Sequence, residues 1–332
     1  MDPLEALTEI ATLLERERAS RYRSQAFRSA AAALSALPPE QRADLGRLQR
    51  TKGIGEKTLR VITEALEGRV PDYLTELRAS AGVAEVPSTL RARLKGDLHA
   101  HSNWSDGLTP IDAMVSAARA LGHEYLALTD HSPRLRVANG LSADRLREQM
   151  TVVGGISGEG FTLLTGIEVD ILEDGMLDQE PGLLESLDVV VASVHSKLRM
   201  DRAPMTRRML AAVRDPNTDV LGHCTGRLVE GSRGTRPASD FDASAVFAAC
   251  AENGVAVEIN SRPERQDPPD DLIAVALAAG CLFSIDSDAH APGQLSLLDH
   301  GARRAEQAGV PAHRIVTTWE LPKLREWLGR DR

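Results

Sequence analysis

The chain has few cysteines and lacks a long hydrophobic run. Its three cysteines, Cys224, Cys250 and Cys281, form no Cys-x-x-Cys pair. This spacing argues against a disulfide framework and against a thiolate zinc site, so we expect reduced thiols in the hydrophobic core. No apolar stretch approaches the ~20 residues of a membrane span, and the acidic residues 1–5 are unlike a secretory signal. We therefore expect a cytoplasmic protein with no membrane association.

Positive charge is also scarce. The 332 residues carry 39 Lys and Arg against 48 Asp and Glu, a net charge of -9. The balance is uneven, because residues 1–95 are slightly basic and the remainder is acidic. The first segment would hold a polyanion more readily. The acidic remainder would bind a phosphate only if cations offset its carboxylates, as the ions of a multi-metal site would.

The first 80 residues have the pattern of a small helical domain. Apolar residues at helical spacing predict two helices within residues 3–35, which Pro38 ends, and a short third helix near residues 41–49. A Gly-Ile-Gly turn at residues 53–55 then precedes a helix that runs to about residue 66. Glycines allow such a tight turn, and the exposed amides at the start of the next helix favour an anion.

A second, larger domain is predicted for residues 94–332. Residues 81–93 lack apolar periodicity and are predicted to be a linker. Seven short apolar runs follow, and a helical stretch comes after each. This alternation is typical of a parallel α/β barrel, although an open doubly wound sheet would give the same pattern. The predicted strands are residues 94–98, 125–129, 161–171, 187–194, 219–222, 255–259 and 282–286.

Six of the nine histidines stand at the ends of these predicted strands. His99 and His101 alternate along one strand and therefore project to the same side. Because active sites of parallel barrels lie at the carboxyl ends of the strands, the other strand-end residues are expected nearby. Imidazoles with carboxylates suit Zn²⁺, Mn²⁺ or Fe²⁺, and a carboxylate such as Glu168 can bridge two ions. The remaining candidates are Asp106, His131, His195, His223, Asp288 and His290.

From residue 96 onward the chain resembles the PHP (polymerase and histidinol phosphatase) family, and most of all the C-terminal domain of bacterial family X DNA polymerases. The resemblance implies a distorted seven-stranded (β/α)7 barrel, phosphoesterase activity and up to three divalent metal ions (Zn, Mn or Fe). The segments that carry it are residues 129–132 (TDHS), 137–141 (VANGL), 166–172 (GIEVDIL), 191–196 (VASVHS), 221–223 (LGH), 225–227 (TGR), 258–260 (EIN) and 286–290 (DSDAH).

The same resemblance assigns the metal ligands. It implies a first ion held by His99, His101, Glu168 and Asp288, and a second held by Glu168, His195 and His223. It implies a third ion held by Asp106, His131 and His290. Each of these positions carries a residue that can bind a metal. The neighbouring polar residues Asp130, Ser196 and Asn260 are expected to orient ligands.

Residues 1–80 resemble the small N-terminal DNA-binding domain of family X DNA polymerases, which contains a helix-hairpin-helix motif. The resemblance rests on residues 22–31 (YRSQAFRSAA), residues 37–38 (LP) and the turn at residues 53–55 with its following lysine. It implies that Gly53, Ile54, Gly55 and Lys57 bind DNA without reading its sequence. Val61 occupies the position of the Schiff-base lysine of the lyase-active relatives, so we expect no deoxyribose-phosphate lyase activity. The two resembling segments leave no room between them for a polymerase domain, so nucleotide addition is not expected.

The expected reaction is metal-assisted phosphoester hydrolysis by a DNA-processing nuclease, of the 3′–5′ exonuclease, AP endonuclease or 3′-phosphatase type used in DNA repair. Glu168, His195 and Arg227 are the expected catalytic residues. Arg134, Lys197 and Arg227 are candidates for binding phosphate, because each follows a predicted ligand within a few residues. Two alternatives remain: a small-molecule phosphatase of the histidinol-phosphate type, and a non-catalytic DNA-binding module with structural metals.

Overall fold

The computed structural model describes residues 1–80, 88–156, 158, 160–231 and 234–329. The chain divides into two compact units, Met1–Val86 with Pro292–Gln294, and Pro87–Ala291 with Leu295–Arg332. Of the predicted linker, residues 81–87 lie outside the described residues. Its later part contains the buried Leu90 and the short 3-10 helix Arg91–Arg93. None of the described helices has the length and apolar character needed to cross a membrane.

The N-terminal unit is entirely helical, and its helices pack around one apolar core. Aspartates fix two of the helix starts, because Asp2 and Asp44 each accept a hydrogen bond from a backbone amide of the first turn, at 3.0 Å. The core includes Leu7, Ile10, Phe27, Leu34 and Ile62. The helices are α1 (Pro3–Arg16), α2 (Arg21–Ser35), α3 (Leu45–Arg50), α4 (Glu56–Leu66) and α5 (Asp72–Ser80), with a 3-10 turn at Pro39–Gln41.

The Gly-Ile-Gly turn connects α3 to α4. Gly53 has a φ of 97°, and a Cβ atom there would lie 3.3 Å from the Ser29 carbonyl oxygen, so a larger residue would be strained. Ile54 is buried in the core, whereas Lys57 is exposed. The Lys57 ammonium lies 3.5 Å from the centroid of the Tyr73 ring, a cation–π contact. The turn therefore packs closely against α2, and Lys57 remains at the surface.

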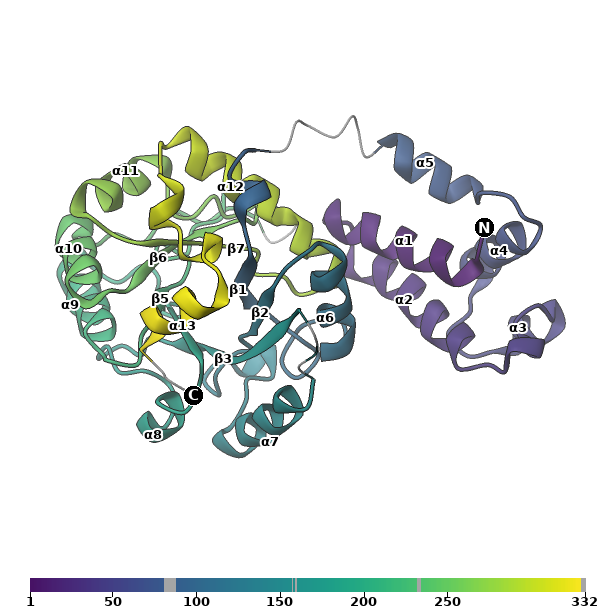
Figure 1. Ribbon diagram of the computed structural model, residues 1–332, viewed down its shortest axis with the longest axis horizontal. Helices are drawn as coiled ribbons and strands as arrows, with labels where there is room; N and C mark the ends of the chain where they lie inside the picture. Colours follow the sequence, from purple (N-terminus) through teal and green to yellow (C-terminus); the bar gives the residue numbers. More distant parts are fainter. Residues whose placement is uncertain (81–87, 157, 159, 232–233, 330–332) are drawn as a thin grey trace. The chain divides into compact units, whose positions relative to one another are not determined.

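The second unit contains seven parallel strands in sequential order, which form a nearly closed barrel (Figure 1). A parallel bridge between Ala100 and Ala289 joins the last strand region to the first. Because the order never reverses, the fold is a barrel and the open doubly wound alternative is wrong. The strands are β1 (Gly96–Ala100), β2 (Tyr125–Leu128), β3 (Thr162–Asp170), β4 (Val189–Ser193), β5 (Val220–Leu221), β6 (Ala256–Asn260) and β7 (Phe283–Asp286).

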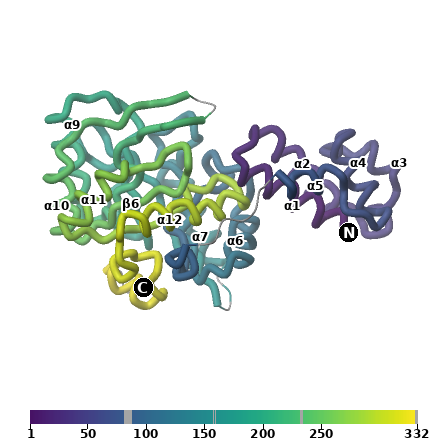
Figure 2. The backbone as a smooth tube through the Cα atoms, turned by 90° about the horizontal axis from the view of Figure 1, so that it is seen from above, coloured from purple at the N-terminus to yellow at the C-terminus, as the bar shows by residue number. Residues whose placement is uncertain are grey.

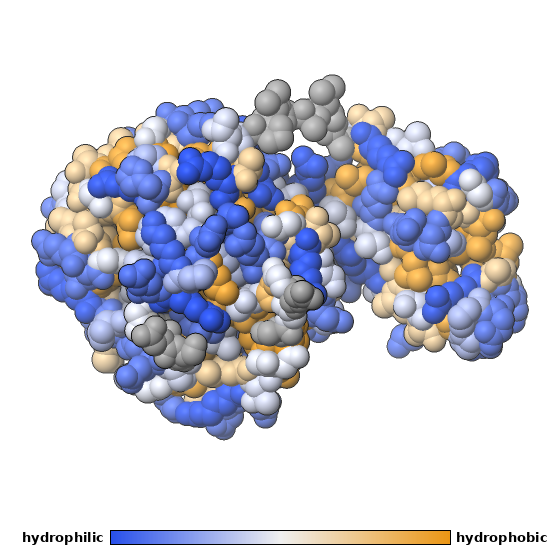
Figure 3. Space-filling model, viewed as in Figure 1, coloured by the Kyte–Doolittle hydropathy of each residue, from blue (hydrophilic) through white to orange (hydrophobic). Residues whose placement is uncertain are grey.

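The strands are almost completely buried, because helices cover them from outside (Figures 1 and 2). Apolar residues therefore occur consecutively in the strands, as in Val189–Ser193. Hydrophilic side chains cover much of the outer face that Figure 3 shows. The helices are α6 (Ile111–Ala120), α7 (Ala143–Gly154), α8 (Pro181–Leu184), α9 (Arg202–Val213), α10 (Ala243–Asn253), α11 (Asp270–Ala279), α12 (Leu298–Gln307) and α13 (Leu321–Leu328).

Helix α13 closes the N-terminal end of the barrel. Its buried Leu324 and Leu328 belong to one apolar cluster with Tyr125, Val189 and Val220, which are the first residues of their strands. Apolar side chains thus fill the N-terminal end of the barrel, and the polar side chains lie at the carboxyl ends of the strands. The predicted candidate ligands all come from that end.

Candidate metal centre

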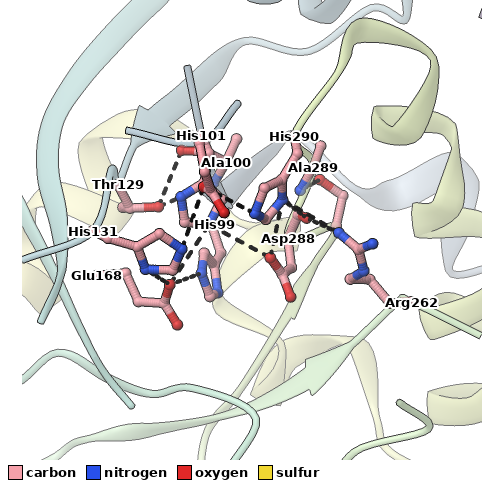
Figure 4. Close-up of polar contacts among 12 residues, drawn as sticks. His99, Ala100, His101, Thr129, His131, Glu168, Arg262, Asp288, Ala289 and His290 are labelled. Carbon is pink, nitrogen blue, oxygen red and sulfur yellow. Dashed lines mark hydrogen bonds and ion pairs between the residues drawn. The ribbon is translucent and has the colours of Figure 1, made fainter. Parts of the chain in front are cut away.

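The six strand-end histidines lie close together at the carboxyl end of the barrel. The ring centroids of His101 and His290 are 4.2 Å apart, and those of His101 and His131 are 4.5 Å apart. The centroids of His195 and His223 are 5.2 Å apart. Figure 4 shows His99, His101, His131 and His290 gathered around Glu168 and Asp288. The parallel strands thus bring residues that lie almost two hundred positions apart in the sequence into one cluster.

The candidate ligand atoms fall into four overlapping groups, within each of which all atoms lie within 4.8 Å of one another. Two of the groups contain Glu168, and the other two contain His101. The grouping differs in detail from the sets expected from the sequence, because His101 lies with the Asp106 group and His131 also lies near Glu168. The groups are His99–Glu168–His223, His131–Glu168–His195, His99–His101–Asp288, and His101–Asp106–His131–His290.

Glu168 stands at the centre of the cluster with only 1% of its surface exposed. Its Oε1 lies 2.7 Å from His223 Nε2 and 3.2 Å from His195 Nε2. Its Oε2 lies 2.8 Å from His131 Nδ1 and 3.3 Å from His99 Nε2. Burial alone would raise the pKa of Glu168, but the neighbouring histidines hold it well below its usual value. The carboxylate is therefore ionised and able to bridge two cations.

Several buried atoms of the cluster have no hydrogen-bond partner in the part of the chain that the structure describes. An unsatisfied buried polar atom costs about 1–3 kcal/mol, and divalent cations at these positions would remove that cost. The residues present therefore fit a multi-metal site. The atoms include His99 Nε2, His101 Nε2, Asp106 Oδ1, Glu168 Oε2 and His195 Nε2.

The other ring nitrogens of three histidines lie beside acceptors. His99 Nδ1 lies 2.6 Å from Glu258 Oε1, and His195 Nδ1 contacts Asp170 Oδ1. His290 Nδ1 lies 2.9 Å from the Asp288 carbonyl oxygen. An N–H group donated to such an acceptor leaves Nε2 as a lone pair for a metal. The sequence prediction missed the roles of Asp170 and Glu258, although Asp170 lies two residues after Glu168 and so faces the same side of β3.

The residues expected to orient ligands have different roles. Asn260 Nδ2 donates to Asp288 Oδ2 at 3.2 Å, as a ligand-orienting residue would. Asp130 instead accepts hydrogen bonds from the Ser102 amide at 2.9 Å and from Gln149 Nε2 at 2.7 Å. Asp130 therefore positions the loop after β1 and does not orient an imidazole. The backbone oxygen of Ser196 accepts a hydrogen bond from Arg208 Nη1 at 2.9 Å, so this residue too supports a loop.

Two arginines that the sequence did not single out lie against the cluster. Arg262 Nη1 donates to the Asp288 carbonyl at 2.9 Å and lies 3.2 Å from His290 Nδ1 (Figure 4). Arg265 Nε donates to Asp288 Oδ2 at 3.1 Å, and its side chain is only 14% exposed. Burial would raise the pKa of Asp288, but Arg265 and His101 hold it well below its usual value. A flanking guanidinium therefore keeps this carboxylate ionised.

The three cations expected to bind phosphate are placed differently from one another. Arg134 and Lys197 are exposed. The Arg227 Nε donates to the carbonyl oxygens of Gln266 and Arg265, at 2.8 and 3.1 Å. Burial lowers the pKa of Arg227. The structure therefore gives Arg227 a role in holding the loop that carries Arg265, and phosphate contact by these three residues stays a prediction.

Two protein families match separate parts of the chain. Residues 97–262 match the PHP domain family, and residues 1–70 match a helix-hairpin-helix domain family. The DNA polymerase/3′-5′ exonuclease PolX of Bacillus subtilis is 33% identical over 241 residues, which cover 72% of this chain and 42% of that protein. The chain thus spans less than half of the length of this relative.

Two further similarities concern phosphatases. A probable phosphatase of Thermoanaerobacter pseudethanolicus is 26% identical over 247 residues, covering 70% of this chain and 93% of that protein. The crystal structure of a histidinol phosphate phosphatase from Lactococcus lactis, complexed with zinc, L-histidinol and phosphate, is 19% identical with a TM-score of 0.48. It covers 65% of this chain and 94% of that one. This structural similarity is too remote to bear on the site.

Proposed function

Since this chain belongs to the PHP domain family of phosphoesterases, we propose that it is a metal-dependent nuclease that processes DNA. The observation that carries the proposal is the buried carboxylate of Glu168 among four imidazoles, in the same chain as a helix-hairpin-helix domain. The Bacillus relative that bears the name of a polymerase and exonuclease supports the same substrate class.

The candidate ligands would divide among three ions, and the first two would share Glu168. Zn²⁺, Mn²⁺ or Fe²⁺ suits a donor set of imidazoles and carboxylates, and such ions would supply Lewis acidity to the phosphoester and to the attacking water. The first ion would be held by His99, His101, Glu168 and Asp288, the second by Glu168, His195 and His223, and the third by Asp106, His131 and His290.

Arg265 is the residue best placed to hold the phosphate. Its Nε is fixed by Asp288, while its two terminal nitrogens make no hydrogen bond with the described residues. Two parallel N–H groups of a guanidinium match two oxygens of a phosphate. Arg265 would therefore bind the phosphoester next to the ions, and Arg227 would hold its loop.

The helical unit would hold the DNA. The backbone of residues 53–55 and the exposed Lys57 form the proposed contact with a DNA phosphate. Val61 is 1% exposed and lies in the helical core. Because Val61 cannot form a Schiff base, we expect this unit to bind DNA without lyase chemistry at that position.

The test compares rates on a 3′-recessed DNA duplex and on histidinol phosphate, with Mn²⁺ or Zn²⁺ added. We expect the duplex to be degraded with a higher kcat/KM, and a folded Glu168→Gln variant to lose turnover. Faster hydrolysis of histidinol phosphate would favour the small-molecule phosphatase, which the match to 93% of a probable phosphatase's length makes the second candidate. Equal rates for the parent chain and a folded His99→Ala variant would instead indicate a non-catalytic module.

A further inference from the structure

The loop that follows β2 begins directly after the candidate metal ligand His131 and closes back on it. The Leu141 amide donates to the His131 carbonyl at 2.7 Å, so residues 132–140 form a closed surface loop. Ser132 Oγ and the Arg134 amide both donate to Asp178 Oδ2, at 3.0 and 2.5 Å. A Cβ atom at Gly140 would lie 1.8 Å from the Ser132 carbonyl oxygen, so only glycine fits there. The loop is thus held in one conformation.

The tip of this loop places one apolar side chain between cations. Val137 is 94% exposed, more than any other large hydrophobic residue that the structure describes. Arg134 and Arg136 are exposed as well, and neither guanidinium makes a hydrogen bond or ion pair with the described residues. Val137 buries almost none of its surface within the chain, so its side chain is available to contact another molecule. We call Arg134, Arg136 and Val137 the loop tip.

The loop also lies beside the loop after β1. Asn139 Nδ2 donates to the Trp104 carbonyl oxygen at 3.2 Å, and Arg145 Nη1 donates to the Asn139 carbonyl oxygen at 2.8 Å. Trp104 precedes the candidate ligand Asp106 by two residues. The loop that carries the loop tip is therefore bonded to the chain segment that leads to Asp106, and it begins directly after His131.

We propose that the loop tip binds the nucleic-acid strand that leads into the metal centre. Guanidinium groups bind backbone phosphates, and an apolar side chain packs against a sugar or a base. A small phosphomonoester carries one phosphate, which the centre itself would hold, so it would leave the loop tip without a partner. The inference rests on the proposed nuclease function and adds to it the residues that would bind the strand outside the metal centre.

The experiment compares hydrolysis of a single-stranded DNA oligonucleotide and of p-nitrophenyl phosphate by the full chain with Mn²⁺. The variants are Val137→Ser and the double variant Arg134→Gln/Arg136→Gln. The first control is Val152→Ser on α7. The second is Arg325→Gln on α13, which lies at the opposite end of the barrel. We expect both loop-tip variants to raise the KM for the oligonucleotide about tenfold, and Val137→Ser to leave kcat and the rate on p-nitrophenyl phosphate unchanged.

Salt gives a second measurement. Loss of two phosphate contacts lowers the slope of log affinity against log salt by roughly 1.4 for a single strand. Anisotropy of a labelled oligonucleotide reports this slope even if the protein hydrolyses neither substrate, so failure of the proposed function is separable from failure of the inference. An unchanged KM and an unchanged slope in both loop-tip variants would overturn the inference and leave the loop tip to a different class of partner.

Discussion

Glu258 Oε1 lies 2.6 Å from His99 Nδ1, and both side chains are completely buried. The other oxygen of Glu258 accepts a hydrogen bond from the His223 backbone amide at 2.5 Å. One carboxylate therefore fixes the orientation of His99 and the position of the segment that carries His223. It touches no candidate ligand atom directed at a metal, so its influence on the centre is indirect.

Replacing Glu258 with glutamine should weaken metal binding without unfolding the chain. The amide keeps the shape of the side chain but removes the negative charge that strengthens His99 as a ligand. Loss of such a partner typically lowers metal affinity or activity about 10–100-fold. The Mn²⁺ concentration that half-activates hydrolysis should therefore rise in Glu258→Gln. An exposed carboxylate on α13 gives the control, and Glu326→Gln should leave this concentration unchanged.

Substitutions of Arg265 should distinguish the effect of its positive charge on activity from the effect of its planar shape. Arg265→Ala should lower kcat/KM about 100-fold, because it removes a fixed pair of donors to the phosphate. Arg265→Lys should recover less than about tenfold of this loss, since an ammonium cannot reproduce the planar fork. Metal content should be measured for each variant, because Arg265 also contacts Asp288. Full activity in Arg265→Ala with normal metal content would contradict the proposed role.

The strand-end histidines could be recognised in the sequence because the geometry of a parallel barrel is regular. Once a run such as Val189–Ser193 is identified as a buried strand, the residue that follows it must lie at the carboxyl end with the others. The first strand was predicted two residues too early, at residues 94–98, whereas β1 is Gly96–Ala100. Leu94 is buried but caps the 3-10 helix Arg91–Arg93, so burial alone misled the prediction.

Arg262 and Arg265 could not be predicted in the same way. They lie in the loop after β6, and the conformation of a loop is not set by a repeating pattern of residues. The contacts of this loop with Asp288 depend on Arg227, which holds it through two backbone carbonyl oxygens. The sequence has five arginines between residues 227 and 265, and only the folded chain shows that Arg262 and Arg265 face the cluster.

Removal of the metal ions should destabilise the barrel unit and leave the helical unit unchanged. The helical core includes no candidate ligand, whereas the barrel cluster buries several atoms that need a partner. A ligand at 1,000 times its Kd stabilises the folded state by about 4 kcal/mol, which for a unit of this size corresponds to roughly 10 °C in Tm. Calorimetry with and without a chelator should show two transitions, of which only that of the barrel unit moves to lower temperature when the chelator is present. Two transitions that move together would contradict the prediction.

His123 should make the barrel unit sensitive to mild acid. It is 4% exposed, neither ring nitrogen has a hydrogen-bond partner among the described residues, and burial together with the charge of Arg91 lowers its pKa to about 4. An unfolded histidine binds its proton near pH 6.5. The neutral form therefore stabilises the fold above pH 6.5, and this contribution is lost as the pH falls from 6.5 through 4.

The size of this effect follows from the shift in pKa, which corresponds to about 3 kcal/mol of unfolding free energy between pH 7 and pH 4. Denaturant unfolding across this range should show that His123→Leu loses less stability on acidification than the parent chain. His313 is exposed, and His313→Asn should follow the parent. Because the comparison uses the slope with pH and not the absolute stability, any packing difference of the leucine cancels. Parallel pH profiles for His123→Leu and the parent would show that His123 does not control the response.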